Sequence, residues 1–503
     1  MYGNISYKKV EKGNMKKENG ITLISLVVTI IILIILSSIS IVSFWGKDGI
    51  LTKASNAAEE SEREQIKERI SLVVEATVIR GNGKIESKIL DNELEKEFGK
   101  DNYKLAIVGK GYLIIVDNVC YKINGDTKET IDYGTNTTIE YAGDLSKNGK
   151  YDGKTEETAY KINCIEDLLE WDNHYSKYIN SFINLEKTLD FEDIYSYNDF
   201  SAITNDINNN NENEYLITEL TTGTGFKPIE SFNGTFDGKN HEIKNLYQNI
   251  NSNAGLYINL NANIKNLVIK GNITSKGYAG AISAKANNST IENCSIEGKL
   301  TCDGTVGGVV GNGLANANLN INKCCNKSII NSTQTAGGII GMAYPAYITN
   351  CYNLGNINSE KIAGGIIGDQ NYNLTIYNSY NRGPIKSNMI AGGIIGRIYS
   401  AAIIKNTYNT GIIEGNQKTG GIVGSALWNN PSISIENSFY LKGTAKVGTN
   451  ICKDTTSIGE DEEMKSEEFI NKLNNYIDNN QDVAGNWVYW EKEESSYPIL
   501  NLN

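Results

Sequence analysis

The phrase AGGIIG, residues Ala336–Gly341, recurs along the chain at nearly constant spacing. Related copies are VGGVVG at Val306, AGGIIG at Ala363 and Ala391, and TGGIVG at Thr419, with degenerate copies at Ala254 and Ala279. The first glycines of the five clear copies are Gly307, Gly337, Gly364, Gly392 and Gly420, which lie 27 to 30 residues apart. A repeat of this length predicts one structural unit that is used many times.

A second column of residues runs in phase with the glycines. An asparagine follows an isoleucine by two residues in each copy, and an aromatic residue follows two positions later in the last four copies. Lys323 takes the asparagine's place in one copy. The asparagines, which we expect at repeat corners, are Asn266, Asn293, Asn350, Asn378, Asn406 and Asn437, and the aromatic residues are Tyr352, Tyr380, Tyr408 and Phe439.

The composition of the repeat predicts a β-solenoid. Each unit holds three short runs rich in β-formers and separated by glycine, with no apolar stripe at helical spacing, which argues against a helical repeat. A propeller blade needs about 40 residues, more than this unit contains. We therefore expect a mainly β fold, a right-handed parallel β-helix with coils of about 28 residues, the handedness following from the crossover rule.

The interior of such a coil can be assigned in part. Isoleucine and valine fill the bore, and an asparagine at a corner can hydrogen-bond to the asparagines of the coils above and below. The sequence leaves open which side of the sheet the tyrosine column faces.

The repeat resembles the GLUG motif family of bacterial surface proteins, many of them adhesin-like. The phrase FNGTFDGKNHEIKNL, Phe232–Leu246, resembles the lead-in that such arrays carry, and the resemblance covers roughly residues 155 to 503. The resemblance implies display at a cell surface. Exposed ends of a stacked array need protection. We expect a helix near Ile165–Trp171 at one end and a C-terminal cap of residues 453–503 at the other.

The N-terminus predicts a membrane helix. Residues Ile21–Trp45 contain no charge, and 25 helical residues exceed the ~30 Å hydrocarbon core of a bilayer. Five lysines precede this stretch, which places the N-terminus in the cytoplasm and the bulk of the chain outside the cell. An uncleaved signal anchor is the simplest interpretation.

Gly20 followed by ITLIS resembles the cleavage and methylation signal of type IV pilins and pseudopilins. The resemblance implies that a prepilin peptidase cuts between Gly20 and Ile21, and that Ile21 becomes a methylated N-terminus. Ser25 stands where that family has a glutamate, and a hydroxyl cannot supply the carboxylate that pairs with a neighbouring pilin-like subunit. The true start is Met1 or Met15.

These observations divide the chain into six parts. They are a leader at 1–20, a transmembrane and extended helix at 21–79, a small α/β pilin-like head at 80–135, a linker at 136–160, the solenoid at 161–452 and the cap at 453–503.

Composition and motifs limit the partners, metal sites and cofactors that we expect. The net charge of -12 argues against a nucleic-acid partner. Some metalloproteases that cleave antibodies carry GLUG-type repeats, but the phrase beginning at His241 ends in Asn245 where H-E-x-x-H needs a second histidine. Asp144, Ser146, Asn148 and Asp152 have partial calcium-loop spacing, but Thr155 stands at the twelfth place, and we favour a polar linker as the explanation of these residues. No cofactor is expected.

We therefore expect a single-pass, membrane-anchored surface protein that uses the solenoid for non-catalytic adhesion to a carbohydrate or protein ligand. One alternative is a minor pilin or pseudopilin of a type II secretion or type IV pilus system. Another is a β-helix carbohydrate-active enzyme, because acids on neighbouring coils can meet in space. The seven acids between Gly271 and Tyr440 are Glu292, Glu297, Asp303, Glu360, Asp369, Glu414 and Glu436.

Overall fold

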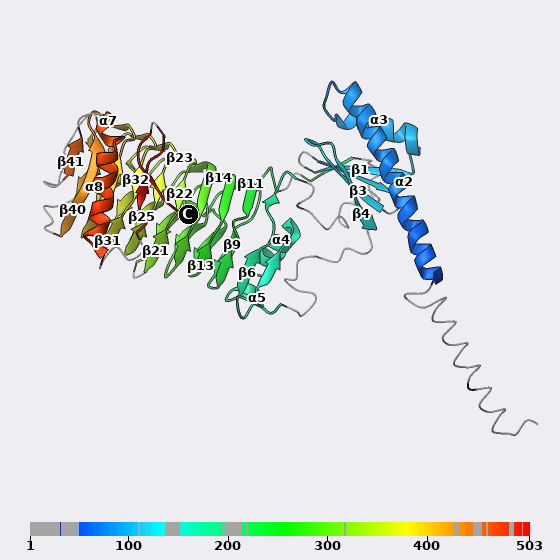
Figure 1. The fold of residues 1–503 in the computed structure, drawn as a ribbon, viewed down its shortest axis with the longest axis horizontal. Coiled ribbons are helices and arrows are strands. Elements are labelled where there is room, and N and C mark those ends of the chain that lie inside the picture. The colour runs from blue at the N-terminus through cyan, green and yellow to red at the C-terminus, as the bar shows by residue number, and fades with distance from the viewer. Residues whose placement is uncertain are drawn as a thin grey trace, which may run out of the picture. The chain divides into compact units, whose positions relative to one another are not determined.

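The computed structural model describes most of the chain beyond residue 50 (Figure 1). The described residues are 31, 50–108, 111–117, 119–135, 151–193, 196, 214–217, 220–315, 318–426, 432–445, 455–458, 461–481, 487–494 and 496–502. The predicted membrane stretch Ile21–Trp45 lies outside them except for Ile31, as do Gly20 and Ser25. No helix in the described part of the chain has both the length and the apolar character needed to span a bilayer.

The chain divides into two compact units, residues 1–69 and 70–503. The helix α2 (Ile50–Arg80) crosses this division and ends where the phrase RGNGK begins. Gly81 N–H donates to the carbonyl of Thr77 at 2.8 Å, and Gly83 has a φ of 90°, which a glycine adopts without strain.

A small α/β head follows this helix. It consists of α3 (Ser87–Phe98) and an antiparallel meander of β1 (Tyr103–Val108), β2 (Gly111–Val116), β3 (Val119–Asn124) and β4 (Thr130–Thr135). A fifth strand, β8 (Glu214–Ile217), pairs parallel to β1. This strand follows the asparagine-rich run at Asn205 and was not expected from the sequence.

The solenoid is built from three parallel sheets. The longest sheet contains the strands on both sides of the corner asparagine in each coil. Each of these strands pairs in parallel with the equivalent strand of the next coil. Before the clear repeats it contains β5 (Tyr160–Ile162), β6 (Phe182–Leu185), β7 (Leu189–Asp190), β10 (Thr235–Asp237), β11 (Glu242–Ile250), β13 (Asn263–Lys265), β14 (Val268–Ser275), β17 (Thr290–Glu292) and β18 (Ser295–Cys302). Its later strands are β21 (Leu319–Asn322), β22 (Cys325–Asn326), β23 (Ile329–Ser332), β26 (Ala346–Thr349), β27 (Tyr352–Asn353), β28 (Ile357–Ser359), β31 (Leu374–Tyr377), β32 (Tyr380–Asn381), β33 (Ile385–Ser387), β36 (Ala402–Asn409), β37 (Ile413–Gly415), β40 (Ile433–Leu441) and β41 (Thr455–Ile458).

The other two sheets carry the glycine-rich phrase of each coil. The six-stranded sheet contains β15 (Tyr278–Gly280), β19 (Thr305–Gly307), β24 (Thr335–Gly337), β29 (Ile362–Gly364), β34 (Ile390–Gly392) and β38 (Lys418–Gly420). The eight-stranded sheet contains β9 (Ile229–Phe232), β12 (Tyr257–Leu260), β16 (Ser283–Ala286), β20 (Val310–Gly313), β25 (Ile340–Ala343), β30 (Ile367–Gln370), β35 (Ile395–Ile398) and β39 (Val423–Ala426). The predicted mainly β fold, a parallel solenoid of the right-handed type with coils of about 28 residues, is confirmed.

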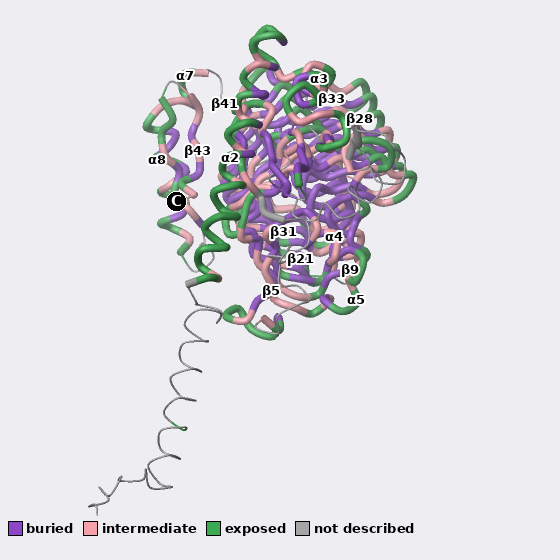
Figure 2. Tube along the Cα trace, turned by 90° about the vertical axis from the view of Figure 1, so that its right-hand side faces the viewer, coloured by how far each residue is buried: buried purple, intermediate pink, exposed green. Residues whose placement is uncertain are grey.

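Aliphatic columns fill the bore. Figure 2 shows buried residues throughout the coils. The isoleucine that precedes each corner asparagine is at most 2% exposed in every coil where it occurs. In-register pairing places these isoleucines over one another in successive coils, and they belong to one buried cluster. The column is Ile264, Ile291, Ile321, Ile348, Ile376, Ile404 and Ile435.

The paired glycines allow two walls of the bore to approach closely. None of the pairs at 337, 364 or 392 has a positive φ, so conformational freedom does not explain them. A Cβ atom on Gly365 would lie 2.0 Å from the carbonyl oxygen of Gly393 and 2.6 Å from the side chain of Asn381. The equivalent Gly338 and Gly393 meet the same obstacles. The second glycine of the pair is therefore required by steric contact with a buried asparagine.

Those buried asparagines form an inner ladder that was not expected from the sequence. Asn326 Nδ2 donates to Asn353 Oδ1 at 2.6 Å, Asn353 to Asn381 at 2.7 Å and Asn381 to Asn409 at 2.6 Å. The second amide hydrogen of Asn353 goes to the carbonyl of Gly355 at 2.9 Å. All four side chains are fully buried, and stacking satisfies groups whose burial would otherwise cost about 1–3 kcal/mol each.

Aromatic side chains close both ends of the bore. Trp171, on α4 (Ile165–Asn173), is fully buried, and its ring centroid lies 4.9 Å from that of Phe232 and 5.3 Å from that of Phe236. The short helix α5 (Tyr175–Tyr178) follows it. At the other end Tyr440 takes the place of Asn409 and lies against Gly421. The helix α4, which the sequence predicted beside the first coils, lies at the end of the solenoid where those coils begin (Figure 1).

Replacement of Gly365 by alanine should destabilise the solenoid by about 3 kcal/mol or more, since overpacking of a rigid core costs about 1–3 kcal/mol even without a backbone clash. Gly313→Ala is the matched control, because its Cβ would meet its nearest neighbour at 3.4 Å and the equivalent positions of other coils hold Ala286 and Ala343. Urea unfolding of the two variants measures the difference. Equal midpoints would show that close approach does not select the glycine.

Candidate functional site

The predicted corner asparagines occupy one corner of the solenoid. All six have a left-handed backbone, with φ between 44° and 55°, and Lys323 at the remaining position has a φ of 51°. Asparagine tolerates this conformation better than most residues, because its short side chain can hydrogen-bond locally. The backbone turns at this point from the first strand of the coil to the second.

The corner side chains form an outer ladder with one direction. Asn293 Nδ2 donates to Asn266 Oδ1 at 2.8 Å, and Asn266 donates to the carboxylate of Asp237 at 3.0 Å. The later rungs follow the same rule at 2.6–2.8 Å: Asn378 donates to Asn350, Asn406 to Asn378 and Asn437 to Asn406. At Lys323 the ladder moves one residue back, because Asn350 donates to Asn322 at 2.8 Å. These asparagines hold coils together.

The tyrosine column lies just beyond this corner, on the outside of the coil. The rings of Tyr352 and Tyr380 are stacked with centroids 4.9 Å apart and planes 2° apart, and Tyr380 stacks on Tyr408 at 5.0 Å. Tyr380 and Tyr408 are nevertheless buried. Another part of the chain must therefore cover an outward-facing column.

The C-terminal segment provides that cover. It contains α7 (Asp461–Met464), α8 (Glu467–Asp478), β42 (Trp490–Glu491) and β43 (Ile499–Leu500), and we call its described residues 461–481, 487–494 and 496–502 the strap. The Trp490 ring lies 5.4 Å from Tyr408 and 5.7 Å from Tyr380, and Phe469 packs against Phe439 at 5.2 Å. The sequence predicted a cap on the last coil, whereas the strap lies along the side of the last coils.

Polar contacts align the strap with the coils. Val488 N–H donates to Asn350 Oδ1 at 3.0 Å, and Asn378 Nδ2 donates to the Val488 carbonyl at 2.7 Å. Arg382 pairs with Glu493 at 2.9 Å. The later part of the asparagine and tyrosine corner therefore serves the strap and is closed to a ligand.

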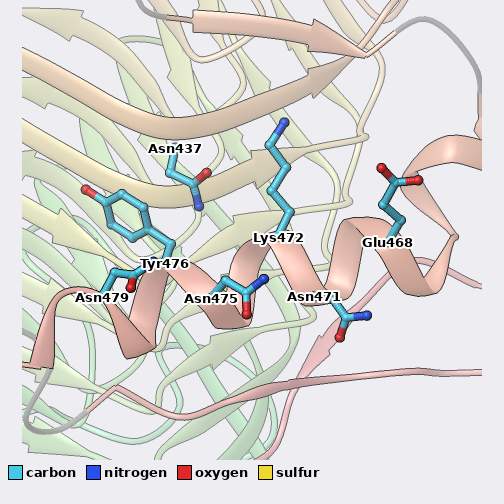
Figure 3. Close-up of a pocket in the computed structure, with 7 residues that line it drawn as sticks. All are labelled: Asn437, Glu468, Asn471, Lys472, Asn475, Tyr476 and Asn479. Carbon is cyan, nitrogen blue, oxygen red and sulfur yellow. The ribbon is translucent and has the colours of Figure 1, made fainter.

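An open cavity of about 670 Å³ lies where the strap meets the last coil (Figure 3). Asn437, the last rung of the outer ladder, faces α8 across it, and Tyr476 donates to Glu436 Oε2 at 2.8 Å beside it. The lining is polar: Asn437, Glu468, Asn471, Lys472, Asn475, Tyr476 and Asn479. We attribute this hollow to the junction between strap and coil.

A second polar surface is not covered by the strap. Two adjoining cavities, of about 330 Å³ and 250 Å³, lie over the second strands of successive coils and share Asn358 and Lys386. We call their combined surface the lateral groove. It is lined by Thr301, Cys302, Asp303, Asn331, Ser332, Thr333, Asn356, Asn358, Ser359, Glu360, Pro384, Ile385, Lys386, Asn388, Ile412 and Glu414.

The strand register arranges the groove in columns. Asn331, Asn358, Lys386 and Glu414 stack over one another, and Thr301 precedes them. Asn358 Nδ2 donates to Asn331 Oδ1 at 3.1 Å, and Lys386 Nζ lies 3.7 Å from Glu414. The groove thus offers amide, hydroxyl, ammonium and carboxylate groups at the spacing of the coils.

The seven acids of the repeat region fall into two groups. Five contact other side chains: Glu292 accepts from Asn322, Glu297 pairs with Lys270 and Lys327, Asp369 with Arg397, Glu414 with Lys386, and Glu436 with Lys405. Asp303 and Glu360 are exposed, and no cation of the described residues lies within ion-pairing distance of either. Both of these acids line the lateral groove.

The calcium-loop candidates are not assembled in the described residues. Asp144, Ser146 and Asn148 lie outside them. Asp152 accepts from Thr158 Oγ1 at 2.7 Å and pairs with Lys154 at 2.8 Å. These bonds, chiefly the one from Lys154, lower the pKa of Asp152 to about 2. Within the described ranges no group of three or more histidine, cysteine, aspartate or glutamate side chains is placed to hold a metal ion.

Replacement of Trp490 by alanine should release the strap while the solenoid stays folded. Trp490 is 2% exposed, and loss of a buried tryptophan costs about 3–5 kcal/mol. Limited proteolysis should then cut within the strap at least tenfold faster than in the wild type. Tyr489→Ala is the control, because Tyr489 is 49% exposed and its hydroxyl contacts Asp478 on the strap itself. Equal cutting of both variants would mean that ring packing does not hold the strap.

No family model matches the sequence, and no curated protein matches it. Among solved structures, the chain is similar to a Bacteroides ovatus protein provisionally named an immunoglobulin A1 protease, with 19% identity and a TM-score of 0.44 over 71% of this chain and 95% of the other. Another similar structure is an IgA1 protease, with 14% identity and a TM-score of 0.33 over 69% of this chain and 26% of that one. Similarities this distant carry no argument about activity.

Proposed function

We propose that this chain is a surface-displayed binding protein whose solenoid presents the lateral groove to a ligand outside the cell. The observation that carries the proposal is the groove itself, two adjoining cavities over successive coils that are lined mainly by polar residues and that the strap leaves open. Its role would be adhesion. The groove lies on stacked strands, so its side chains are held by a rigid scaffold at fixed separations.

The charges of the solenoid support this choice of face. Five of the seven acids in the repeat region contact other side chains, and the two that form no ion pair or side-chain hydrogen bond with a described residue, Asp303 and Glu360, both line the groove. Exposed carboxylates with no structural partner remain available to accept hydrogen bonds from a ligand. The strap covers the tyrosine stack, which leaves the groove as the polar face that fits a ligand best.

A second candidate is a carbohydrate-active hydrolase. Asp303 and Glu360 line the same cavity and come from coils two apart, so their backbones are separated by about twice the ~4.8 Å strand spacing. Inverting glycosidases hold two carboxyl groups about 6.5–9.5 Å apart. Release of reducing sugar ends by the purified chain, lost in Glu360→Gln, would favour this activity over simple adhesion.

Attachment to the membrane is part of the proposal. The uncharged stretch Ile21–Trp45 would anchor the chain, and the Gly20–Ile21 bond would be the site of a prepilin-type peptidase. A minor pilin or pseudopilin would share this N-terminus, but Ser25 lacks the carboxylate that pairs subunits within a membrane. We therefore favour a tethered adhesin over a filament subunit.

The N-terminal residue of the protein recovered from host membranes should be Ile21, with or without an added methyl group. Peptide mapping by mass spectrometry measures it, and Gly20→Leu should block the cut. Recovery of a chain that begins at Met1 or Met15 would contradict processing and leave a signal anchor.

Blocking the groove should abolish adhesion. Cells that display the full chain would be tested on immobilised mucin, cellulose, chitin, collagen and fibronectin. Thr333→Trp should lower attachment at least tenfold on the surface that the wild type binds, because the new ring fills the groove. Thr375→Trp is the matched control, since Thr375 lies on β31 away from the groove. Equal attachment by both variants would place the binding surface elsewhere.

A further inference from the structure

We infer that the lateral groove binds a neutral, linear polysaccharide that lies along the solenoid axis with one sugar ring over each coil. This inference rests on the proposed function, because it names the ligand class of the same groove. Its basis is the match between the repeat of the groove and the repeat of the ligand, together with the chemistry of the lining and its charge.

The geometry favours a polymer with a short and regular repeat. The column Thr301, Asn331, Asn358, Lys386 and Glu414 advances by one coil at each step, which is the ~4.8 Å spacing of paired strands. A pyranose unit in an extended glycan has nearly this length. An extended polypeptide advances about 3.3 Å per residue, so its residues fall out of register with the coils.

The chemistry of the lining favours hydroxyl groups as partners. A sugar hydroxyl donates one hydrogen bond and accepts others, so it needs neighbours of both kinds. Asn331 and Asn358 supply amide donors and acceptors, while Asp303 and Glu360 supply carboxylates. A carboxylate has two oxygens and can accept from two adjacent hydroxyls of one ring. The amides lie on two successive coils, and the two carboxylates lie two coils apart.

Apolar side chains lie beside the polar columns. Ile329, Asn356, Pro384 and Ile412 occupy one column, and Ile329 is 44% and Ile412 57% exposed. Asn356 separates Ile329 from Pro384 and Ile412, which are neighbours on successive coils. These apolar groups suit the C–H face of a sugar ring.

A protein ligand fits this surface poorly. Binding hot spots are rich in tryptophan, tyrosine and arginine, and the lining residues include none of these. A peptide that adds a strand needs a free sheet edge, whereas β23, β28 and β33 are each paired on both sides. The groove lies on the face of the sheet, where side chains alone make contact.

The charge of the groove argues against an anionic polymer. Lys386 is engaged with Glu414, which leaves Asp303 and Glu360 as uncompensated negative charges at the rim. A sulfated or uronic-acid chain would meet both of them. A neutral glycan avoids this repulsion, and its binding should depend little on salt.

The test is calorimetric titration of the detergent-solubilised full chain with cello-, xylo- and chito-oligosaccharides, from disaccharide to octasaccharide. Affinity for one series should rise with chain length up to about five units, the number of coils in the column, and then level off. Asp303→Asn and Glu360→Gln should each weaken binding about threefold to tenfold. Glu230→Gln, an exposed acid on β9 of another sheet, should have no effect.

The outcomes separate this inference from the proposed function. Binding that ignores chain length, or equal weakening by Glu230→Gln, would overturn the axial arrangement. Tighter binding of heparin than of any neutral series would overturn the choice of a neutral glycan. If none of the oligosaccharides binds while Thr333→Trp still abolishes adhesion, the ligand class is wrong and the groove remains the adhesive surface. If Thr333→Trp leaves adhesion intact, both proposals fail.

Discussion

The contact between the paired glycines and the buried asparagine ladder constrains the rest of the solenoid. A side chain on Gly338 or Gly365 would occupy the space of an asparagine, Asn353 or Asn381, that is itself hydrogen-bonded to the coils on either side. Within a coil, the separation from the inner asparagine to the second glycine is constant at 12 positions, as from Asn353 to Gly365, and the coil length varies elsewhere. Extra residues enter at one corner, between the eight-stranded sheet and the next coil: five positions separate Lys285 from Thr290, but eight separate the paired residues Asn312 and Asn320.

Much of this architecture could be predicted from the sequence because it repeats. The period, the parallel stacking and the isoleucine column follow from spacing alone. The inner ladder was missed because an inward asparagine such as Asn353 looks unfavourable in a single strand, and only its neighbours in adjacent coils satisfy it. The signal was present in the repeated dipeptide at Tyr352, Tyr380 and Tyr408, where asparagine follows each tyrosine.

The candidate site was harder to predict because its features do not repeat. The strap occurs once, and no periodic pattern shows that Trp490 covers Tyr380 and Tyr408. The groove differs from the rest of the surface in residues that vary from coil to coil. At one position of three successive coils these residues are Asp303, Thr333 and Glu360. Repetition builds the scaffold, and departures from repetition distinguish one face from another.

The two asparagine ladders run in opposite directions. In the outer ladder each coil donates to the one before it, as Asn378 does to Asn350, whereas in the inner ladder Asn353 donates to Asn381 of the coil after it. A chain is synthesised from its N-terminus, and coils of a solenoid interact mainly with their neighbours. The corner asparagine of each new coil therefore donates to the coil before it, and the inner asparagine of the new coil accepts from the coil before it. Growth in chain order thus fixes the register of each coil, and the strap, which follows the coils in the sequence, then packs across the later ones.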